Sequence, residues 1–260
     1  MKAILAAVGM MIVTPAFAGG TNVYFMSDTS LIRKYTAPVT IAEEKEQGGV
    51  SVERFHKEMA MAFREMVGRK YRDTSITYID SVSREAHSYK PAELIRASRA
   101  EIIEKHYPVD DCGAYDKWFG KLNFKMRQDA PDASFVILYA PLIPVGDYWC
   151  DDKISKEERS QNPFPSLPII PNDSLGIEVV FRQKNLREII IVSAHSEQEI
   201  PYYDYLEKLN DRRMQRNAIV EGDQEKTQPI KITFMTTETA LKQLPGIIST
   251  WCKGAKSCEL

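Results

Sequence analysis

The chain lacks most of the motifs by which enzymes and nucleotide-binding proteins are identified from sequence. It has no glycine-rich phosphate-binding loop and no dinucleotide-binding glycine pattern. It also has no G-x-S-x-G turn, the nucleophile motif of the α/β hydrolases. None of its four histidines stands in an H-x-x-x-H or H-E-x-x-H pattern, which excludes the usual helical zinc sites. These absences count against the commonest classes of enzyme.

An excess of positive charge is missing too. The 260 residues carry 34 lysines and arginines against 36 aspartates and glutamates, a formal net charge of −2. Proteins that bind nucleic acid or anionic membranes concentrate positive charge on one surface, so neither kind of partner is expected. Beyond the first 18 residues, no apolar run approaches the roughly 20 residues that a membrane-spanning helix needs. No membrane span is therefore expected.

The first 18 residues have the pattern of a secretory signal peptide. Lys2 supplies a positive start, residues 3–13 are apolar, and Ala16 and Ala18 form a small-x-small cleavage site. We expect cleavage after Ala18 and a mature protein that is periplasmic or secreted. An N-terminal core helix is the alternative, and the cleavage pattern disfavours it.

The mature residues, 19–260, are expected to form a single α+β domain. Residues 19–50 indicate a loosely structured segment with one short strand at 22–26. Alternating apolar residues predict two hairpins and a mostly antiparallel sheet, packed by three or four helices. The predicted hairpins lie at about 115–143 and 175–194, further strands at 74–82 and 230–236, and helices at about 52–70, 91–105 and 201–218. A last helix is expected from Thr237, broken or kinked at Pro245.

Four cysteines favour a disulfide-stapled fold, because thiols oxidise by default outside the cytoplasm. Cys252 and Cys258 flank five residues and close a small loop. Pairing the first hairpin about Pro131 sets three apolar pairs on one face and places Cys112 opposite Cys150. We therefore expect bonds 112–150 and 252–258. A redox or zinc site at the second pair is the alternative, although both usually use C-x-x-C spacing.

The same hairpin register gathers a group of aspartates. Like charges brought this close repel one another, and a hard cation such as Ca²⁺ relieves the repulsion. A calcium-stabilised structural protein is therefore one hypothesis, and a hydrated pair of acidic loops is the simpler interpretation. The aspartates of this group are Asp110, Asp111, Asp151 and Asp152. No resident cofactor is expected.

The longest predicted connection, residues 151–173, is charged in its first half and rich in proline in its second. Loops of this length inside a domain are usually functional or disordered. Its apolar second half indicates packing, against either the protein's own sheet or a partner. The candidate binding residues are Phe164, Leu167, Ile169 and Ile170.

The histidines offer little catalytic promise. His56 is expected on the exposed flank of its helix, and His106 at a helix end. His195 follows a buried strand, where catalytic groups are often found, but Ser196 with Glu199 three residues later is typical of a helix capping box. The tryptophans and tyrosines at 118, 148, 149 and 251 are expected to fill a core rather than a binding patch.

Taken together, the sequence favours an exported protein-binding factor over an enzyme. The classes considered are an inhibitor, an immunity-type protein or a component of an envelope assembly, each with another protein as partner. An envelope hydrolase with a site near His195 and the calcium-stabilised structural protein remain the alternatives.

Overall fold

The fold is built on one six-stranded sheet. The computed structural model describes residues 20–27, 38, 40–69, 74–80, 86–89, 115–140, 142, 176–194, 196–221 and 228–251. The strands are β1 (Thr21–Ser27), β2 (Thr74–Asp80), β3 (Ala86–Tyr89), β4 (Ala133–Tyr139), β5 (Leu186–Val192) and β6 (Lys231–Met235). Their order in the sheet is β3-β2-β1-β4-β5-β6. Five strands run parallel, and β3 alone runs antiparallel, to β2.

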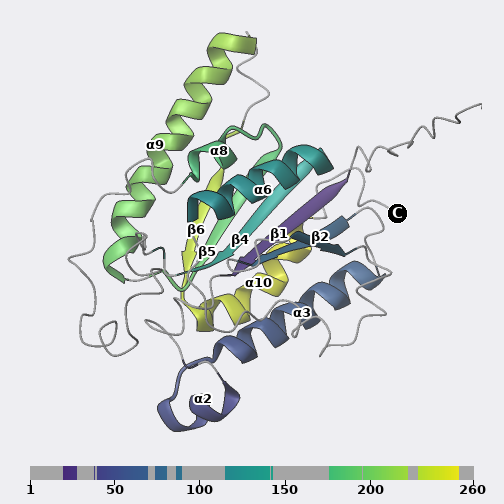
Figure 1. The fold of residues 1–260 in the computed structure, drawn as a ribbon, viewed down its shortest axis with the longest axis vertical. Coiled ribbons are helices and arrows are strands. Elements are labelled where there is room, and N and C mark those ends of the chain that lie inside the picture. Colours follow the sequence, from purple (N-terminus) through teal and green to yellow (C-terminus); the bar gives the residue numbers. More distant parts are fainter. Residues whose placement is uncertain are drawn as a thin grey trace, which may run out of the picture.

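Helices cover both faces of the sheet (Figure 1). They are α2 (Ile41–Gln47), α3 (Val52–Arg69), α6 (Tyr115–Asp129), α8 (Glu178–Phe181), α9 (Ser196–Glu221) and α10 (Thr237–Trp251). The side chains of α3 and α10 pack on one face, and those of α6, α8 and α9 on the other. The fold is therefore a three-layer α/β sandwich with two separate cores.

Strand alternation distributes side chains between the two cores. In β1, Val23 and Phe25 face α3 and α10, whereas Tyr24 and Met26 face α6, α8 and α9. Because both faces are covered, every residue of β1 is buried. Near-continuous apolar strands such as 133–139 and 186–192 are typical of parallel sheets with helices on both sides.

The sequence predictions for several elements are confirmed. The helix expected at 52–70 is α3, whose apolar side chains recur at helical spacing and are buried: Val52, Phe55, Met59 and Phe63. Ser51 caps it, because its hydroxyl accepts a hydrogen bond from the Arg54 backbone N–H at 3.2 Å. The strands expected at 22–26, 74–82 and 230–236, and the helix expected at 201–218, are also present. The last helix continues past Pro245 as α10.

The mostly antiparallel sheet and the first hairpin are wrong. Residues 115–129 form helix α6, because Phe119, Leu122 and Met126 recur at helical spacing and are buried. The hairpin register also required Phe124 on the core side, and its side chain is 62% exposed. The alternation of polar and apolar residues over 121–127 is therefore compatible with a helix in which Phe124 is exposed.

The second hairpin is wrong for the same reason. Ile177, Val180 and Phe181 are buried at helical spacing, and residues 178–181 form the short helix α8. The following strand, β5, pairs with β4 and β6 in parallel rather than with the residues before it. The antiparallel α+β class is therefore corrected to a doubly wound α/β class.

The disulfide-stapled description has no support from the described residues, which hold no disulfide. All four cysteines lie outside them, so both pairings stay predictions. The register that placed Cys112 opposite Cys150 is lost, since one of its two strands is the helix α6. The aspartate cluster, built on the same register, loses its basis with it. The helix expected at 91–105 and the signal peptide also lie outside the described residues.

Charged side chains hold the amino end of the sheet together. Asp129, which ends α6, accepts hydrogen bonds from the Asn22 side-chain amide at 2.9 Å and the Tyr24 hydroxyl at 3.0 Å. Lys125 pairs with the other carboxylate oxygen at 2.7 Å. Burial, helped by the Asp129 charge, raises the pKa of Tyr24 far above its ordinary value, so this hydroxyl remains a donor.

Two further charged residues, Glu188 and Arg213, stabilise the same end. Trp251 at the end of α10 donates its indole N–H to the buried Glu188 at 2.7 Å, and Lys231 forms an ion pair with Glu188 at 2.8 Å. Arg213 of α9 donates to the backbone carbonyls of Gln228 at 2.9 Å and Lys184 at 3.0 Å. Arg213 thereby ties together the segments that lead into β5 and β6.

Candidate binding site

The carboxyl end of the sheet contains the topological switch point of the fold. The chain moves from β1 to β2 on one side of it, and the later strand β4 returns to the other side. In open α/β sheets, ligands bind outside the carboxyl ends of the strands at such a point. The candidate site is therefore the region where β1 and β4 end.

Ser27, the last residue of β1, meets His56 of α3 at this point. The Ser27 hydroxyl and His56 Nε2 lie 2.7 Å apart, within hydrogen-bond distance. The contact is long-range, because 29 residues separate the two. It fixes the first turns of α3 against the end of the central strand.

Aromatic rings enclose His56. Phe25 of β1 and Tyr139 of β4 stand nearly perpendicular to its ring, with centroids at 5.6 and 5.7 Å. Phe55 packs beside it at 6.3 Å. Burial in these surroundings lowers the pKa of His56 to about 3, because the charged imidazolium loses its hydration. His56 is therefore neutral at physiological pH.

The Ser27–His56 pair is poorly suited to catalysis. A serine nucleophile must reach a substrate, and Ser27 is only 3% exposed and His56 only 6%. A general base also works best with a pKa near the operating pH, and burial moves that of His56 well below it. The pair acts as a buried latch between α3 and β1. The expectation that His56 lies on an exposed flank is wrong, because α3 turns it toward the sheet.

Leu142, in the connection after β4, and Ser193, directly after β5, adopt left-handed backbone conformations. Leu142 has φ 58° and Ser193 has φ 65°, a region that residues other than glycine seldom occupy. Ser193 is secured twice: its N–H donates to the Met235 carbonyl at 2.9 Å, and its hydroxyl accepts from Thr237 at 3.2 Å. Surrounding packing thus redirects the chain sharply as it leaves the sheet.

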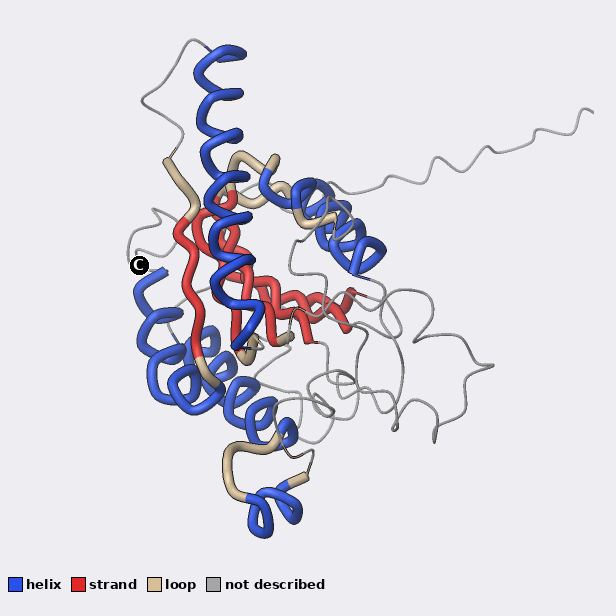
Figure 2. Tube along the Cα trace, turned by 90° about the vertical axis from the view of Figure 1, so that its left-hand side faces the viewer, coloured by secondary structure: helices blue, strands red, loops and turns tan. Residues whose placement is uncertain are grey.

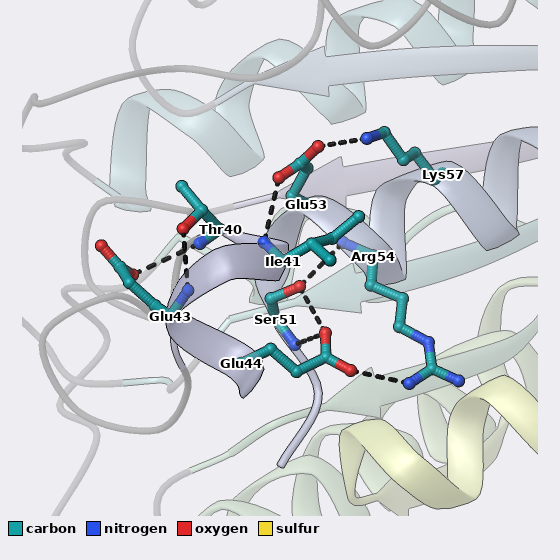
Figure 3. Close-up of polar contacts among 8 residues, drawn as sticks. All are labelled: Thr40, Ile41, Glu43, Glu44, Ser51, Glu53, Arg54 and Lys57. Carbon is teal, nitrogen blue, oxygen red and sulfur yellow. Dashed lines mark hydrogen bonds and ion pairs between the residues drawn. The ribbon is translucent and has the colours of Figure 1, made fainter. Parts of the chain in front are cut away.

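Helix α2 projects from the N-terminal end of α3 (Figure 1). None of its residues is fully buried, and among the described residues a set of polar contacts joins it to α3 (Figure 3). Glu44 accepts hydrogen bonds from the Ser51 N–H at 3.0 Å and the Ser51 hydroxyl at 2.7 Å, and pairs with Arg54 at 2.7 Å. In return Glu53 of α3 accepts from the Ile41 N–H at 3.0 Å. Each helix therefore caps the start of the other.

The contacts of Glu44 also set its titration. The two hydrogen bonds from Ser51, followed by the Arg54 guanidinium, lower the pKa of Glu44 to about 2. Thr40 adds a capping box at the start of α2, exchanging hydrogen bonds with the backbone and side chain of Glu43. Glu53 also pairs with Lys57, one turn along α3. The joint therefore depends on ionised carboxylates.

The residues predicted for binding lie outside the described part of the chain, which ends at Leu142 and resumes at 176. The connection that carries Phe164, Leu167, Ile169 and Ile170 leaves β4 at the switch point. His195 also falls outside the described residues. Among those that are described, no three histidine, cysteine, aspartate or glutamate side chains come together to hold a metal ion. Trp251 is confirmed as a core residue.

Sequence reasoning missed Ser27 and His56. Ser27 ends an apolar strand, and strand ends often carry functional groups, which is the signal in the sequence that points to it. Pairing Ser27 with His56 requires the parallel order of β1, β2 and β4. A prediction of parallel strands would have brought both residues to one end of the sheet.

No family model and no curated protein matches the sequence. Among solved structures, the fold is similar to a mutant of the PilB minor pilin from Streptococcus sanguinis, with a TM-score of 0.52 and 13% identity over 89% of this chain. This chain spans 61% of that pilin's length. A second similar structure is the vWF domain of the type V pili tip protein Mfa5 from Porphyromonas gingivalis, with a TM-score of 0.48, 10% identity, and coverage of 94% of this chain and 99% of that one.

The first likeness establishes a shared fold and nothing finer, because the identity is only 13%. The second has a TM-score below 0.5 and supports no inference. No helix in the described ranges combines the length and apolarity needed to cross a bilayer.

Proposed function

We propose that this protein is an exported protein-binding factor that works in an envelope or cell-surface assembly and binds its partner at the carboxyl end of the sheet. The observation that carries the proposal is the point of departure of the long connection. Residues 143–175 leave β4 beside the switch point, where α/β sheets bind their ligands. This connection carries the apolar, proline-rich stretch 163–171.

The remaining surfaces of the sheet support this choice. Both faces of the sheet are covered by helices and filled by apolar cores, so neither face is open to a ligand. At the carboxyl end, Ser27 and His56 are buried and serve packing rather than chemistry. The fold shared with a minor pilin and the signal-peptide pattern of residues 1–18 agree with an exported assembly component.

The test replaces Phe164 and Leu167 together with serine and compares the variant with the wild type. Each protein is used to capture partners from an envelope fraction, and the bound proteins are identified by mass spectrometry. We expect the variant to lose a specific partner that the wild type retains, since apolar anchors dominate binding energy. Melting temperatures of the two proteins should be nearly equal.

A matched control replaces Glu157 and Glu158 with serine, in the charged half of the same connection. This control should keep the partner. A large fall in melting temperature for the Phe164/Leu167 variant contradicts the proposal, because it means that the stretch belongs to the core. Equal capture by all three proteins contradicts it as well.

A further inference from the structure

The two edges of the sheet differ in how well they are protected. The β3 edge is short and antiparallel, whereas β6 ends the parallel part of the sheet and pairs only with β5 among the described strands. The backbone groups on the outer side of such a strand are available to another strand. Burial reflects this position: β1 is buried throughout, and β6 is exposed or half-buried at its first four residues.

Exposed apolar side chains line this edge. Ile200 and Tyr203, near the start of α9, are 72% and 45% exposed. The Tyr203 ring lies beside Phe234 of β6, with centroids 6.2 Å apart. Phe234 and Ile232 are themselves only partly buried against the core. Ile232 and Phe234 lie at alternate positions of β6, on the sheet face that α9 covers, and Ile200 and Tyr203 lie one turn apart on α9. We call these four residues the apolar strip. Figure 2 views the molecule from the side on which Figure 1 shows both elements.

Charges on α9 are sorted with respect to that strip. Asn210 exchanges two hydrogen bonds with the backbone of Ile230, both at 2.9 Å, which identifies the flank of α9 nearest to β6. Glu207 and Asp211 follow Tyr203 at four-residue spacing on this flank. The basic residues Lys208, Arg212 and Arg216 form the next ridge, farther from β6, and all three are exposed.

Helix stability explains only part of the sorting. Like charges four residues apart destabilise a helix, and opposite charges stabilise it. Asp204 with Lys208 is an opposite-charge pair at that spacing, whereas Glu207 with Asp211, and Arg212 with Arg216, are like-charged pairs. No ion pair within the described residues engages Glu207 or Asp211. The two carboxylates are therefore available to positive charge that no described residue supplies.

From these observations we infer that β6 and the neighbouring flank of α9 bind an extended segment of another protein, which adds a strand to the sheet. Its backbone pairs with the outer side of β6. Its apolar side chains, at every second position, lie on Ile200, Tyr203, Ile232 and Phe234. Its basic residues occupy further alternate positions on the same face, because successive side chains of a strand point to opposite faces, and there they meet Glu207 and Asp211. This surface is separate from the carboxyl end of the sheet.

A second copy of this chain is a poorer fit for the surface. A symmetric contact between two β6 strands brings the same α9 flank from both copies together across the dyad. Glu207 and Asp211 of each copy then approach those of the other, and like charges across a contact oppose association. The acidic ridge thus favours a basic segment over self-association.

The experiment uses three labelled synthetic octapeptides and the full chain. In the first, valines at positions 1 and 3 and lysines at positions 5 and 7 share one face, and serines fill the other positions. The second has glutamates in place of the lysines, and the third repeats the first with a fully N-methylated backbone. Fluorescence anisotropy should show binding of the first peptide only. The glutamate peptide should fail because of charge, and the methylated peptide because it lacks the N–H groups that a new strand needs.

Substitutions on α9 test whether the lysine peptide binds at this surface. Ile200→Ser with Tyr203→Ser, and separately Glu207→Gln with Asp211→Asn, should each weaken the lysine peptide by about tenfold or more. The matched control, Arg212→Gln with Arg216→Gln on the neighbouring ridge, should not weaken it. Melting temperatures verify that each variant is folded. The Phe164/Leu167 variant should bind the peptide normally, so this inference and the proposed function fail independently.

Several results overturn the inference. One is no binding of the lysine peptide to the wild type, and another is equal binding of the lysine and glutamate peptides. A third is unchanged affinity in the Ile200/Tyr203 variant. A dimer in sedimentation experiments that dissociates in that variant assigns the edge to a second copy instead.

Discussion

The two ends of the sheet are held together in different ways. At the amino end, charged groups bind several partners at once: Asp129 contacts three side chains, Glu188 two, and Arg213 bridges separate backbone segments. At the carboxyl end, the contacts between described residues are neutral pairs such as Ser27 with His56 and Thr237 with Ser193. The connection from α6 to β4 is a short turn, whereas the one that leaves β4 spans residues 140–177.

This difference suggests a division in which the amino end of the sheet determines stability and the carboxyl end determines partner binding. Multiple charge-assisted hydrogen bonds at the amino end fix the strand register and the helix ends. Among the described residues, the carboxyl end is joined by contacts between neutral groups. We expect substitutions at the amino end to change the free energy of unfolding, and substitutions in the connection to change partner binding.

The largest effect is expected from Asp129→Ala. This change leaves the buried Asn22 and Tyr24 donors without their acceptor and removes the partner of Lys125. The free energy of unfolding should fall by about 3 kcal/mol, as measured by urea denaturation. Asp204→Ala, an exposed aspartate on α9, is the control and should change it by less than about 0.5 kcal/mol. Equal effects of the two substitutions would show that the Asp129 contacts add no stability.

Arg213→Lys should have the next largest effect. The planar guanidinium reaches the carbonyls of Gln228 and Lys184 together, and a lysine ammonium cannot reproduce this fork. We expect a loss of about 2 kcal/mol in the same measurement. Arg212→Lys, on the exposed face, serves as the matched control. A loss confined to the control would contradict the assigned role.

At the carboxyl end, His56 should make the free energy of unfolding depend on pH. The pKa of His56 is lowered to about 3 from its ordinary value, so the unfolded chain takes up a proton below about pH 6.5 and the folded chain does not. Stability is therefore complete above that pH and decreases as the pH falls from 6.5 toward 3. Between pH 7.5 and 5 the decrease from this group should be about 2 kcal/mol.

His56→Gln keeps a hydrogen-bonding side chain at this position but cannot titrate. Denaturation of this variant at several pH values should show a shallower fall than the wild type between pH 6.5 and 5. Glu44 does not confuse this range, because its contribution is lost only well below pH 5, as its carboxylate becomes protonated. Parallel curves for the two proteins would place the pH dependence elsewhere.

The smallest effect is expected at the joint of α2 and α3. Glu44→Gln removes the charge that binds Arg54 and weakens the contacts with Ser51. Global stability should change by at most about 1 kcal/mol, because the joint lies at the surface. Hydrogen exchange of the amides in residues 41–47 should accelerate, whereas that of β1 should not. Unchanged exchange in α2 would show that other contacts attach it.

The sequence predicted local structure better than topology. The stripe of Val52, Phe55, Met59 and Phe63 identifies α3 because all four bury the same face. In α6 the exposed Phe124 disguised a similar stripe as an alternating strand. Leu122 and Met126, four residues apart, satisfy both the helical and the strand period, whereas Phe124 fits only the strand period. The spacing of these residues alone therefore did not distinguish a helix from a strand.

The candidate site was harder to predict, since it depends on strand order. Ser27 and His56 are 29 residues apart and meet only because β1 is central and α3 packs across it. The near-continuous apolar runs of β4 and β5 indicate parallel strands, and this signal was available in the sequence. The exposed strip of Ile200 and Tyr203 has no local signature, because exposure is a property of the assembled fold.

The most direct test of the separation between the two ends combines two measurements on the same variants. Capture from the envelope fraction and melting temperature are compared for the Phe164/Leu167 variant and for Asp129→Ala. The account predicts loss of the partner with an unchanged melting temperature for the first, and a lowered melting temperature with the partner retained below it for the second. A marked fall in melting temperature for the Phe164/Leu167 variant, with its partner still bound, would contradict the account.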